Sequence, residues 1–272
     1  MIAFTKMQGA GNDYIYIDNR NEVVKNPAEL SPKISDRHFG VGSDGLVLIC
    51  PSDKADIRMR MFNPDGSESE MCGNASRCVA RFAWERFFQK EKDEFDLETG
   101  AGIKHIVIHH DCKNFQSATI DMGAPILEPE QIPVAAPTNR IRIDGREFTC
   151  VSMGNPHAVT FVDSVQTAPV LTKGPAYEMD KAFPRKANIE FVEVLSPTHA
   201  KMRVWERGTG ETLACGTGSC ATLVACVLNG NTEREIDLEL LGGTLHIEWR
   251  EDNSHVMMTG PAEFVFEGTF DE

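Results

Sequence analysis

Cys72 and Cys215 stand out because each precedes a glycine at the point where a strand-like segment gives way to a helical one. A thiol in such a position faces the N–H groups and the positive end of the helix dipole, which lower its pKa and favour the thiolate. Gly73, Gly216 and Gly218 let backbone amides approach a ligand closely, and amides at a helix N-terminus bind carboxylates. The pair therefore predicts one carboxylate held between two helix ends, with a thiol on either face of the attached carbon. Removing a proton from one face and delivering one to the other inverts that carbon.

Other roles for these cysteines stay open at this point. Cysteine is often a small core residue, and a symmetric pair of thiols also suits a redox switch. Zinc is disfavoured, since five residues separate Cys72 from Cys78 and four separate Cys215 from Cys220, whereas zinc sites favour pairs such as Cys-x2-Cys. A disulfide framework is the minor interpretation, because the eight cysteines of a cytosolic chain are expected to be reduced.

An internal repeat relates the two cysteines to each other. A gapless shift of 143 residues carries Cys72 onto Cys215 and aligns several separated segments in the same register. The aligned pairs are 11–12 with 154–155, 46–48 with 189–191, 58–62 with 201–205, and 71–73 with 214–216. Chance similarity between short strands is the alternative, but chance rarely keeps one register over several segments. The repeat predicts two homologous α/β halves that face each other across a pseudo-twofold axis.

The elements that must position these motifs are mostly strands. Strand-like segments cover residues 2–6, 14–18, 46–50, 57–62, 103–109, 118–122, 141–144, 158–162, 189–194, 201–205, 236–240, 244–249 and 255–259. Helices are expected at 27–37, 76–89 and 219–228, and the last is apolar on every face, which is typical of a helix enclosed by sheet. Prolines within 125–137 mark the best candidate for a connection between the halves. We expect one domain to comprise residues 1–117 with 261–272, and the other to comprise 118–260.

Composition limits the classes of function. The 272 residues include 27 Lys and Arg against 41 Asp and Glu, and the net charge of -14 disfavours nucleic acid as a partner. Hydrophobic residues make up 41% and charged residues 25%, which is ordinary for a globular protein of this length. No apolar run approaches the roughly 20 residues of a membrane-spanning helix, and the first residues lack signal-peptide features. We expect a cytoplasmic protein with no membrane partner.

The sequence motifs of this chain closely resemble those of the diaminopimelate epimerase family. They are FTKMQGAGNDY at 4–14, MCGNASRC at 71–78, GNPH at 154–157, WERG at 205–208 and ACGTGSCA at 214–221. The resemblance covers essentially the whole chain. It implies a pyridoxal-phosphate-independent isomerase, with no cofactor, that interconverts LL- and meso-2,6-diaminopimelate in lysine and peptidoglycan precursor synthesis. It also implies an α/β (α+β) fold of two pseudo-symmetric domains, each a curled mixed sheet around a central helix, with the active site in the cleft between them. A homodimer is compatible with the resemblance.

The resemblance also assigns roles to individual residues. Cys72 and Cys215 match the acid–base pair, and His157 and Glu206 match residues that assist the thiols. Without the family, His157 is more often a turn residue. The positions that match α-carboxylate binding are Gly73, Asn74, Gly216 and Thr217. The positions that match other substrate contacts, including those to the distal amino acid end, are Asn12, Asn63, Asn155, Asn188, Glu206 and Arg207. An arginine suits that end because its planar fork binds a carboxylate through two hydrogen bonds.

Two positions depart from the family pattern. Ala75 stands where the motif usually has Gly, and it carries strain if the backbone there needs a positive φ. Gly45 stands where some members use a substrate-binding Gln, and the shift pairs it with Asn188. We therefore do not expect Gly45 to contact the substrate through a side chain.

Several alternatives can be weighed against this interpretation. Residues 40–45 fit the pattern GxGxxG, but a helix is expected before them and a strand after, which is the wrong order for a dinucleotide loop. Proline racemase and hydroxyproline epimerase also use two cysteines, yet usually carry His where this chain has Asn74. Another amino acid racemase on the same scaffold is the closest competitor. A thiol-redox protein or a non-catalytic binding protein is the alternative from a different class. No metal site is expected.

Overall fold

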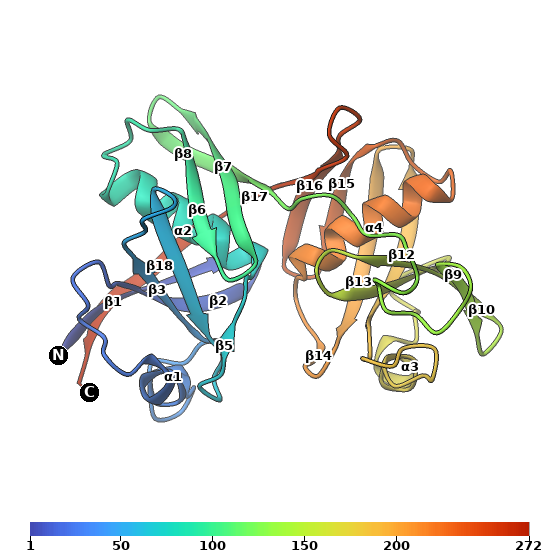
Figure 1. Cartoon of the computed structure of the whole chain (residues 1–272), viewed down its shortest axis with the longest axis horizontal. Coiled ribbons are helices and arrows are strands. Elements are labelled where there is room, and N and C mark those ends of the chain that lie inside the picture. Colours follow the sequence, from blue (N-terminus) through green and yellow to red (C-terminus); the bar gives the residue numbers. More distant parts are fainter. Residues whose placement is uncertain (272) are drawn as a thin grey trace. The chain divides into compact units, whose positions relative to one another are not determined.

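The computed structural model describes residues 1–271, and their contacts divide the chain into two compact units (Figure 1). Unit 1 comprises Met1–Ile120 with the C-terminal residues from Gly260, and unit 2 comprises Asp121–Thr259. The proline-containing segment 125–137 belongs to unit 2, where Ile132 and Val134 are buried in the core. No helix among the described residues is both long and apolar enough to cross a membrane.

Unit 1 contains a mixed sheet in the order β18-β1-β2-β3-β4-β6-β7-β8, with the short strand β5 also paired to β4. Its strands are β1 (Ile2–Gly9), β2 (Asn12–Asp18), β3 (Leu46–Cys50), β4 (Ile57–Phe62), β5 (Glu68–Ser69), β6 (Glu94–Thr99), β7 (Gly102–Asp111), β8 (Asn114–Asp121) and β18 (Glu263–Phe270). Strands β2 and β3 are parallel, as are β4 and β6. The other neighbouring strands of this unit are antiparallel.

Unit 2 repeats this topology in the order β9-β10-β11-β12-β13-β15-β16-β17, with β14 paired to β13. Its strands are β9 (Arg140–Ile143), β10 (Arg146–Ser152), β11 (Pro156–Phe161), β12 (Asn188–Ser196), β13 (His199–Glu206), β14 (Gly210–Glu211), β15 (Glu235–Leu240), β16 (Gly243–Trp249) and β17 (Val256–Gly260). The parallel pairs are again the equivalent ones, β11 with β12 and β13 with β15.

The strand registers preserve the repeat seen in the sequence. Leu46 pairs with Phe62 between β3 and β4. At the positions shifted by 143 residues, Ile189 pairs with Trp205 between β12 and β13. Both units are therefore built on one plan, and the predicted organisation into two similar α/β halves is confirmed.

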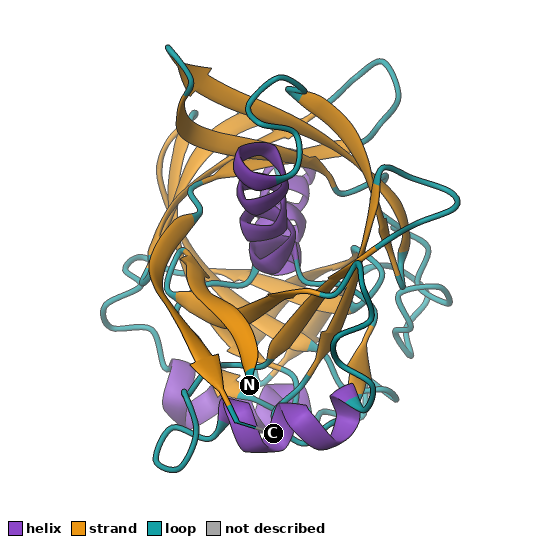
Figure 2. Cartoon of the chain, turned by 90° about the vertical axis from the view of Figure 1, so that its left-hand side faces the viewer, coloured by secondary structure: helices purple, strands orange, loops and turns teal. Residues whose placement is uncertain are grey.

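Each unit encloses one long helix within its curved sheet, and Figure 2 shows the unit that carries the N-terminus in this way. The helices are α2 (Gly73–Arg86) in unit 1 and α4 (Gly216–Leu228) in unit 2. Helix α4 is buried along almost its whole length, as its apolar sequence predicts. Both helices begin immediately after the cysteines rather than at the predicted residues 76 and 219.

A shorter helix packs on the other face of each sheet. Helix α1 (Pro27–Ser35) buries Leu30 and Ile34 in a core with Ile15 and Leu46. Helix α3 (Val170–Glu178), which was not predicted, buries Val170 and Tyr177 in the core of unit 2. Because side chains alternate between the faces of a strand, the residues between these core positions point toward the long helix. The sheet, with the short helix packed on its other face, therefore holds the long helix in place. The cysteine at the N-terminus of that helix is positioned in the same way.

Candidate active site

Cys72 occupies the N-cap position of α2, and its extended backbone leads β5 into the helix. Its Sγ lies 3.4 Å from Oδ1 of Asn12, to which the thiol donates. Nδ2 of Asn74 donates to the same oxygen over 3.4 Å. Asn12 begins β2, directly after the tight turn at Ala10 and Gly11, whose positive φ angles of 53° and 82° suit a two-residue hairpin. Three predicted site residues, Asn12, Cys72 and Asn74, thus meet in unit 1.

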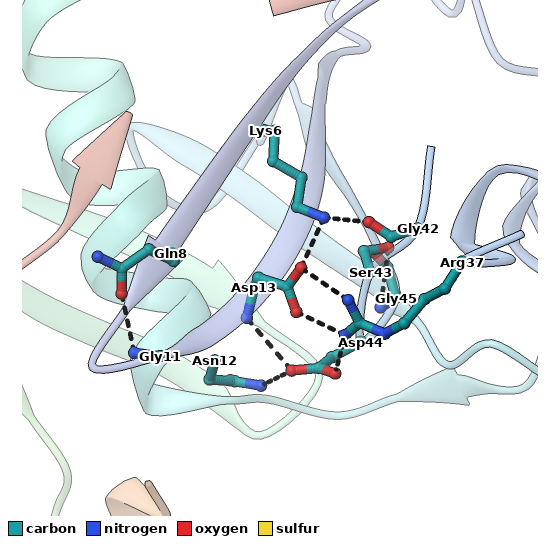
Figure 3. A network of polar contacts seen from close by, with 10 residues as sticks. All are labelled: Lys6, Gln8, Gly11, Asn12, Asp13, Arg37, Gly42, Ser43, Asp44 and Gly45. Carbon is teal, nitrogen blue, oxygen red and sulfur yellow. Dashed lines mark hydrogen bonds and ion pairs between the residues drawn. The ribbon is translucent and has the colours of Figure 1, made fainter. Parts of the chain in front are cut away.

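A polar network fixes the position of Asn12 from the other side (Figure 3). Nδ2 of Asn12 donates to Oδ2 of Asp44 over 2.6 Å, and the backbone N–H of Asp13 donates to the same oxygen over 3.2 Å. Arg37 bridges Asp44 and Asp13, with 2.8 Å to an oxygen of each. Lys6 pairs with Asp13 over 2.6 Å. Burial raises the pKa of Asp13, but its hydrogen bonds with Arg37 and Lys6 outweigh this effect and hold the pKa below its usual range.

Gly73, also predicted, is the first residue of α2, and Asn63 lies in the turn after β4. Its side chain donates to Oγ of Ser67 over 3.0 Å, so the amide helps to close that turn. Gly45 has no room for a side chain, because an added Cβ would lie 2.3 Å from the carbonyl oxygen of Phe62. The glutamine used by some family members at this position therefore does not fit this backbone.

Cys215 occupies the equivalent N-cap position of α4 in unit 2. Its Sγ accepts a hydrogen bond from the N–H of Gly218 over 3.3 Å and lies 3.6 Å from Oγ1 of Thr217. Hydroxyl groups of Ser219 and, in unit 1, Ser76 bond back to the carbonyl of the respective cysteine over 2.8 and 2.9 Å. The two helix starts therefore share the same local construction.

The pKa of Cys215 lies well above its usual value, which corrects the expectation that the helix N-terminus favours the thiolate. Burial is the largest cause, and the carboxylates of Glu206 and Glu190 add to it. The contacts with Thr217 and the N–H of Gly218 lower the pKa, but by less. The thiol is only 5% exposed, so loss of hydration outweighs the helix dipole.

His157 is fully buried on β11, between two polar partners. Its Nδ1 lies 2.6 Å from Oε1 of Glu190 on β12, and its Nε2 lies 3.0 Å from Oδ1 of Asn155. Burial raises the pKa of Glu190, while His157 opposes that shift. Asn155 precedes β11 just as Asn12 begins β2, which follows from the repeat.

The other predicted residues of unit 2 gather where β12 and β13 meet. Asn188 is buried, donates to the carbonyl of Pro156 over 2.8 Å and accepts from the backbone N–H of Arg207 over 2.9 Å. Glu206 accepts a hydrogen bond from the hydroxyl of Thr212. The Arg207 side chain is exposed, and its Nη1 donates to a backbone carbonyl at residue 185 over 3.1 Å. The side-chain amide of Asn188 thus holds the backbone at residue 207, and the Arg207 side chain extends from there into solvent.

Ala75 does not carry the strain considered for it. Neither Ala75 nor Gly218 has a positive φ, since both lie inside regular helix. Gly218 is instead required by space, because an added Cβ would lie 2.8 Å from Oε1 of Glu190 and 3.2 Å from Sγ of Cys215. At the position equivalent to Glu190, unit 1 has Val47, so the alanine fits.

Three residues in the surroundings of Cys72 and Cys215 were not predicted from the sequence. Asp44 lies within the 40–45 loop that was set aside as a false dinucleotide motif, and α1 before it with β3 after it supports that rejection. Glu190 is a charged residue between Ile189 and Phe191, and this position within an apolar run was the signal available for it. Tyr14 is buried at the position equivalent to His157, and burial raises its pKa, with further contributions from Cys72 and Asp44.

The chain was compared with known families and proteins. The family model described as "Diaminopimelate epimerase" matches residues 4–128 and 149–265. The diaminopimelate epimerase of Acetivibrio thermocellus is 56% identical over 275 residues and covers 98% of both chains. That of Methanococcus maripaludis is 52% identical and covers 98% of this chain and 99% of its own.

Among solved structures, a phenazine biosynthesis protein of the PhzF family from Bacillus anthracis superposes with a TM-score of 0.73 at 20% identity, covering 98% of both chains. A probable proline racemase from Agrobacterium radiobacter gives a TM-score of 0.74 at 14% identity, covering 100% of this chain and 93% of its own. At these identities the two structures show the fold alone. The sequence matches extend over nearly the whole length, and the chain therefore belongs to the diaminopimelate epimerase family.

Proposed function

We propose that this protein is a cofactor-independent isomerase that interconverts LL- and meso-2,6-diaminopimelate, in lysine and peptidoglycan precursor biosynthesis. Family membership supports the substrate, since the relatives carry that name at up to 56% identity. The observation that carries the mechanism is the duplicated N-cap cysteine, Cys72 on α2 and Cys215 on α4. A cytoplasmic location and a homodimer complete the proposal, in keeping with the resemblance.

The substrate α-carboxylate would bind to N–H groups at the N-termini of α2 and α4. Its ligands are the N–H groups of Gly73 and Asn74 on one side and of Gly216 and Thr217 on the other. The N–H groups of the first helical turn lie before the first intrahelical hydrogen bond, and the helix dipole favours negative charge there. In the proposed mechanism each of the two thiols serves one face of the α-carbon.

The reaction transfers one proton on each face. The thiolate of one cysteine takes the α-proton, and the electron pair of the C–H bond moves into the α-carboxylate. Charge that develops on this carboxylate would be stabilised by the N–H groups and dipoles of the helix N-termini that bind it. The thiol of the other cysteine then protonates the opposite face, so the carbon is inverted and the two sulfurs have exchanged roles.

The other proposed residues assist the thiols or bind the substrate. His157 and Glu206 would move protons to and from the thiols. Glu206 acts on Cys215 through its charge, and His157 bonds to Glu190, whose charge also acts on Cys215. The exposed fork of Arg207 would bind the distal carboxylate. The amides of Asn12, Asn63, Asn155 and Asn188 would supply or position neutral donors and acceptors around the two ends of the substrate.

A panel of amino acids tests the substrate. Reduced protein is incubated separately with LL-diaminopimelate, L-proline, trans-4-hydroxy-L-proline and L-lysine, and the products are separated by chiral chromatography. We expect inversion of diaminopimelate alone. Inversion of proline or hydroxyproline would favour the second candidate, another amino acid racemase on this fold. The structural similarity to a probable proline racemase is the reason for including these two substrates.

A further inference from the structure

Glu190 is a buried carboxylate that the proposed mechanism does not use. Its side chain is fully buried on β12, and Oε1 lies 2.6 Å from Nδ1 of His157. Within residues 1–271 its other oxygen, Oε2, has no hydrogen-bond partner. A buried carboxylate with one partner is expensive to maintain, so its presence calls for a reason.

The internal repeat shows that the fold itself does not require this carboxylate. Glu190 pairs with Val159 between β11 and β12. The equivalent pair in unit 1 is Val47 with Tyr16, and Val47 is also fully buried. The same sheet position is thus filled by an apolar side chain in one unit and by a carboxylate in the other. Glu190 therefore serves something that is particular to unit 2.

What is particular to unit 2 is the histidine. His157 stands where unit 1 has Tyr14, and its two ring nitrogens face Glu190 and Asn155. The Asn155 oxygen can only accept, so Nε2 carries a proton, and one further proton lies in the 2.6 Å contact between Nδ1 and Oε1 of Glu190. These two contacts fix the orientation of the ring, as the acidic partner of a catalytic histidine commonly does.

Glu190 also lies against the turn that carries Cys215. Its Oε1 is 2.8 Å from the place where a Cβ at residue 218 would be, and Sγ of Cys215 is 3.2 Å from that same place. The ionisable groups that act on Glu190 or feel its charge are His157, Glu206, Cys215 and Cys150. The carboxylate is therefore part of the surroundings of the thiol without being exposed to a ligand.

We propose that Glu190 is a positioning residue of the epimerase, which lies beside the turn of Cys215 and holds the ring of His157 in one orientation. The inference rests on the proposed function. It adds that the surroundings of the two cysteines differ chemically. Unit 2, with Cys215, has the pair Glu190 and His157, whereas unit 1, with Cys72, has Tyr14 at the position equivalent to the histidine.

Three variants of Glu190 and its surroundings test this role. Glu190→Gln keeps a polar partner for Nδ1 of His157 but removes the carboxylate, whereas Glu190→Val installs the residue of unit 1. We expect kcat to fall about tenfold to a hundredfold in Glu190→Val and by less in Glu190→Gln, with little change in KM. The pH profile of kcat should shift in both. Glu193→Gln, on the same strand with its carboxylate bonded to the backbone N–H of Val165, is the matched control and should retain parental kinetics.

A double variant separates positioning from packing. Gly218→Ala alone should lower the melting temperature because its Cβ meets Glu190. Adding Glu190→Val reproduces the Val47 and Ala75 arrangement of unit 1 and should restore the melting temperature but not kcat. A double variant with both parental stability and parental kcat would overturn the proposal.

Spectroscopy gives a readout that does not depend on the substrate. In protein labelled with ¹⁵N-histidine, the resonances lost in His157→Asn identify His157, and its Nδ1–H should be strongly deshielded in the parent but not in Glu190→Val. An unchanged His157 spectrum in Glu190→Val contradicts the positioning role. If the parent fails to epimerise diaminopimelate while this signature is present, the proposed function is wrong and the Glu190–His157 pairing stands.

Discussion

Nδ2 of Asn12 donates a 2.6 Å hydrogen bond to Oδ2 of Asp44, and this contact decides which end of the amide faces Cys72. With its NH₂ group committed to Asp44, Asn12 turns Oδ1 toward the thiol. Arg37 bonds to the other oxygen of Asp44 and so completes the chain of contacts. The ion pair between Arg37 and Asp44 is thereby linked to Sγ of Cys72 through the side-chain amide of Asn12.

Removing Asp44 should therefore lower activity. In Asp44→Ala the Asn12 amide loses its charged acceptor and can rotate, so we expect kcat/KM to fall about tenfold or more, as the loss of a hydrogen bond to a charged group implies. Asp44→Asn, which retains an acceptor oxygen, should recover part of this loss.

Asp13→Asn is the matched control for Asp44. Asp13 shares Arg37 with Asp44 and also pairs with Lys6, but its carboxylate does not bond to Asn12. Its replacement should weaken the ion pairs and lower the melting temperature while leaving kcat/KM close to the parental value. Equal losses of activity in both variants would mean that the network acts only through stability.

The raised pKa of Cys215 predicts slow alkylation. Because the thiolate is the reactive form, iodoacetamide should modify Cys215 slowly near pH 8 and faster as the pH rises. Glu206→Gln removes a negative charge that raises this pKa, so the pKa should fall and the rate at a given pH should increase. The measurement is peptide mapping by mass spectrometry in a Cys112→Ser background, which removes the exposed thiol. A slower rate in Glu206→Gln would contradict the assigned cause.

Arg207 should matter for the distal end of the substrate. Arg207→Ala removes the proposed partner of the distal carboxylate, and a hydrogen bond to a charged group is worth roughly 1.5–3 kcal/mol, so kcat/KM for diaminopimelate should fall at least about tenfold. Arg185→Ala is the control, since Nη1 of Arg207 bonds only to the backbone carbonyl of Arg185. The role is refuted if folded Arg207→Ala protein keeps the parental kcat/KM.

Local signals explain what could be predicted from the sequence. Strands β3 and β4 have the predicted bounds, because short apolar runs flanked by polar turns leave little choice of register. Helices α2 and α4 were both predicted, although each begins three residues earlier than expected, directly after its cysteine. The repeat extends these local signals to the whole architecture, down to the pairing of Leu46 with Phe62 and of Ile189 with Trp205.

Features that depend on distant residues could not be predicted. Helix α3 contains Gly174 and Pro175, residue types that usually interrupt a helix, so it was not predicted. In the structure Gly174 allows α3 to pack closely on β13, because an added Cβ would lie 2.7 Å from Trp205. Residues 261–272 were expected in the same domain as residues 1–117, but strand β18 and its pairing with β1 were not predicted, because no local pattern reveals that contact. The direction of the pKa shift of Cys215 was predicted wrongly for the same reason. The sequence shows that a helix starts at this cysteine, but not that the thiol is buried.

Solvent hydrogen exchange tests the two-thiol mechanism most directly. When LL-diaminopimelate is converted in deuterium oxide and the reaction is stopped early, mass spectrometry and NMR give the deuterium content of product and of recovered substrate. If Cys72 and Cys215 each serve one face, the inverted carbon of the product carries solvent deuterium and the recovered substrate carries little, because the proton removed and the deuteron delivered belong to different sulfurs. A product that keeps substrate-derived hydrogen at the inverted carbon would require a single shared base and would contradict the two-cysteine account.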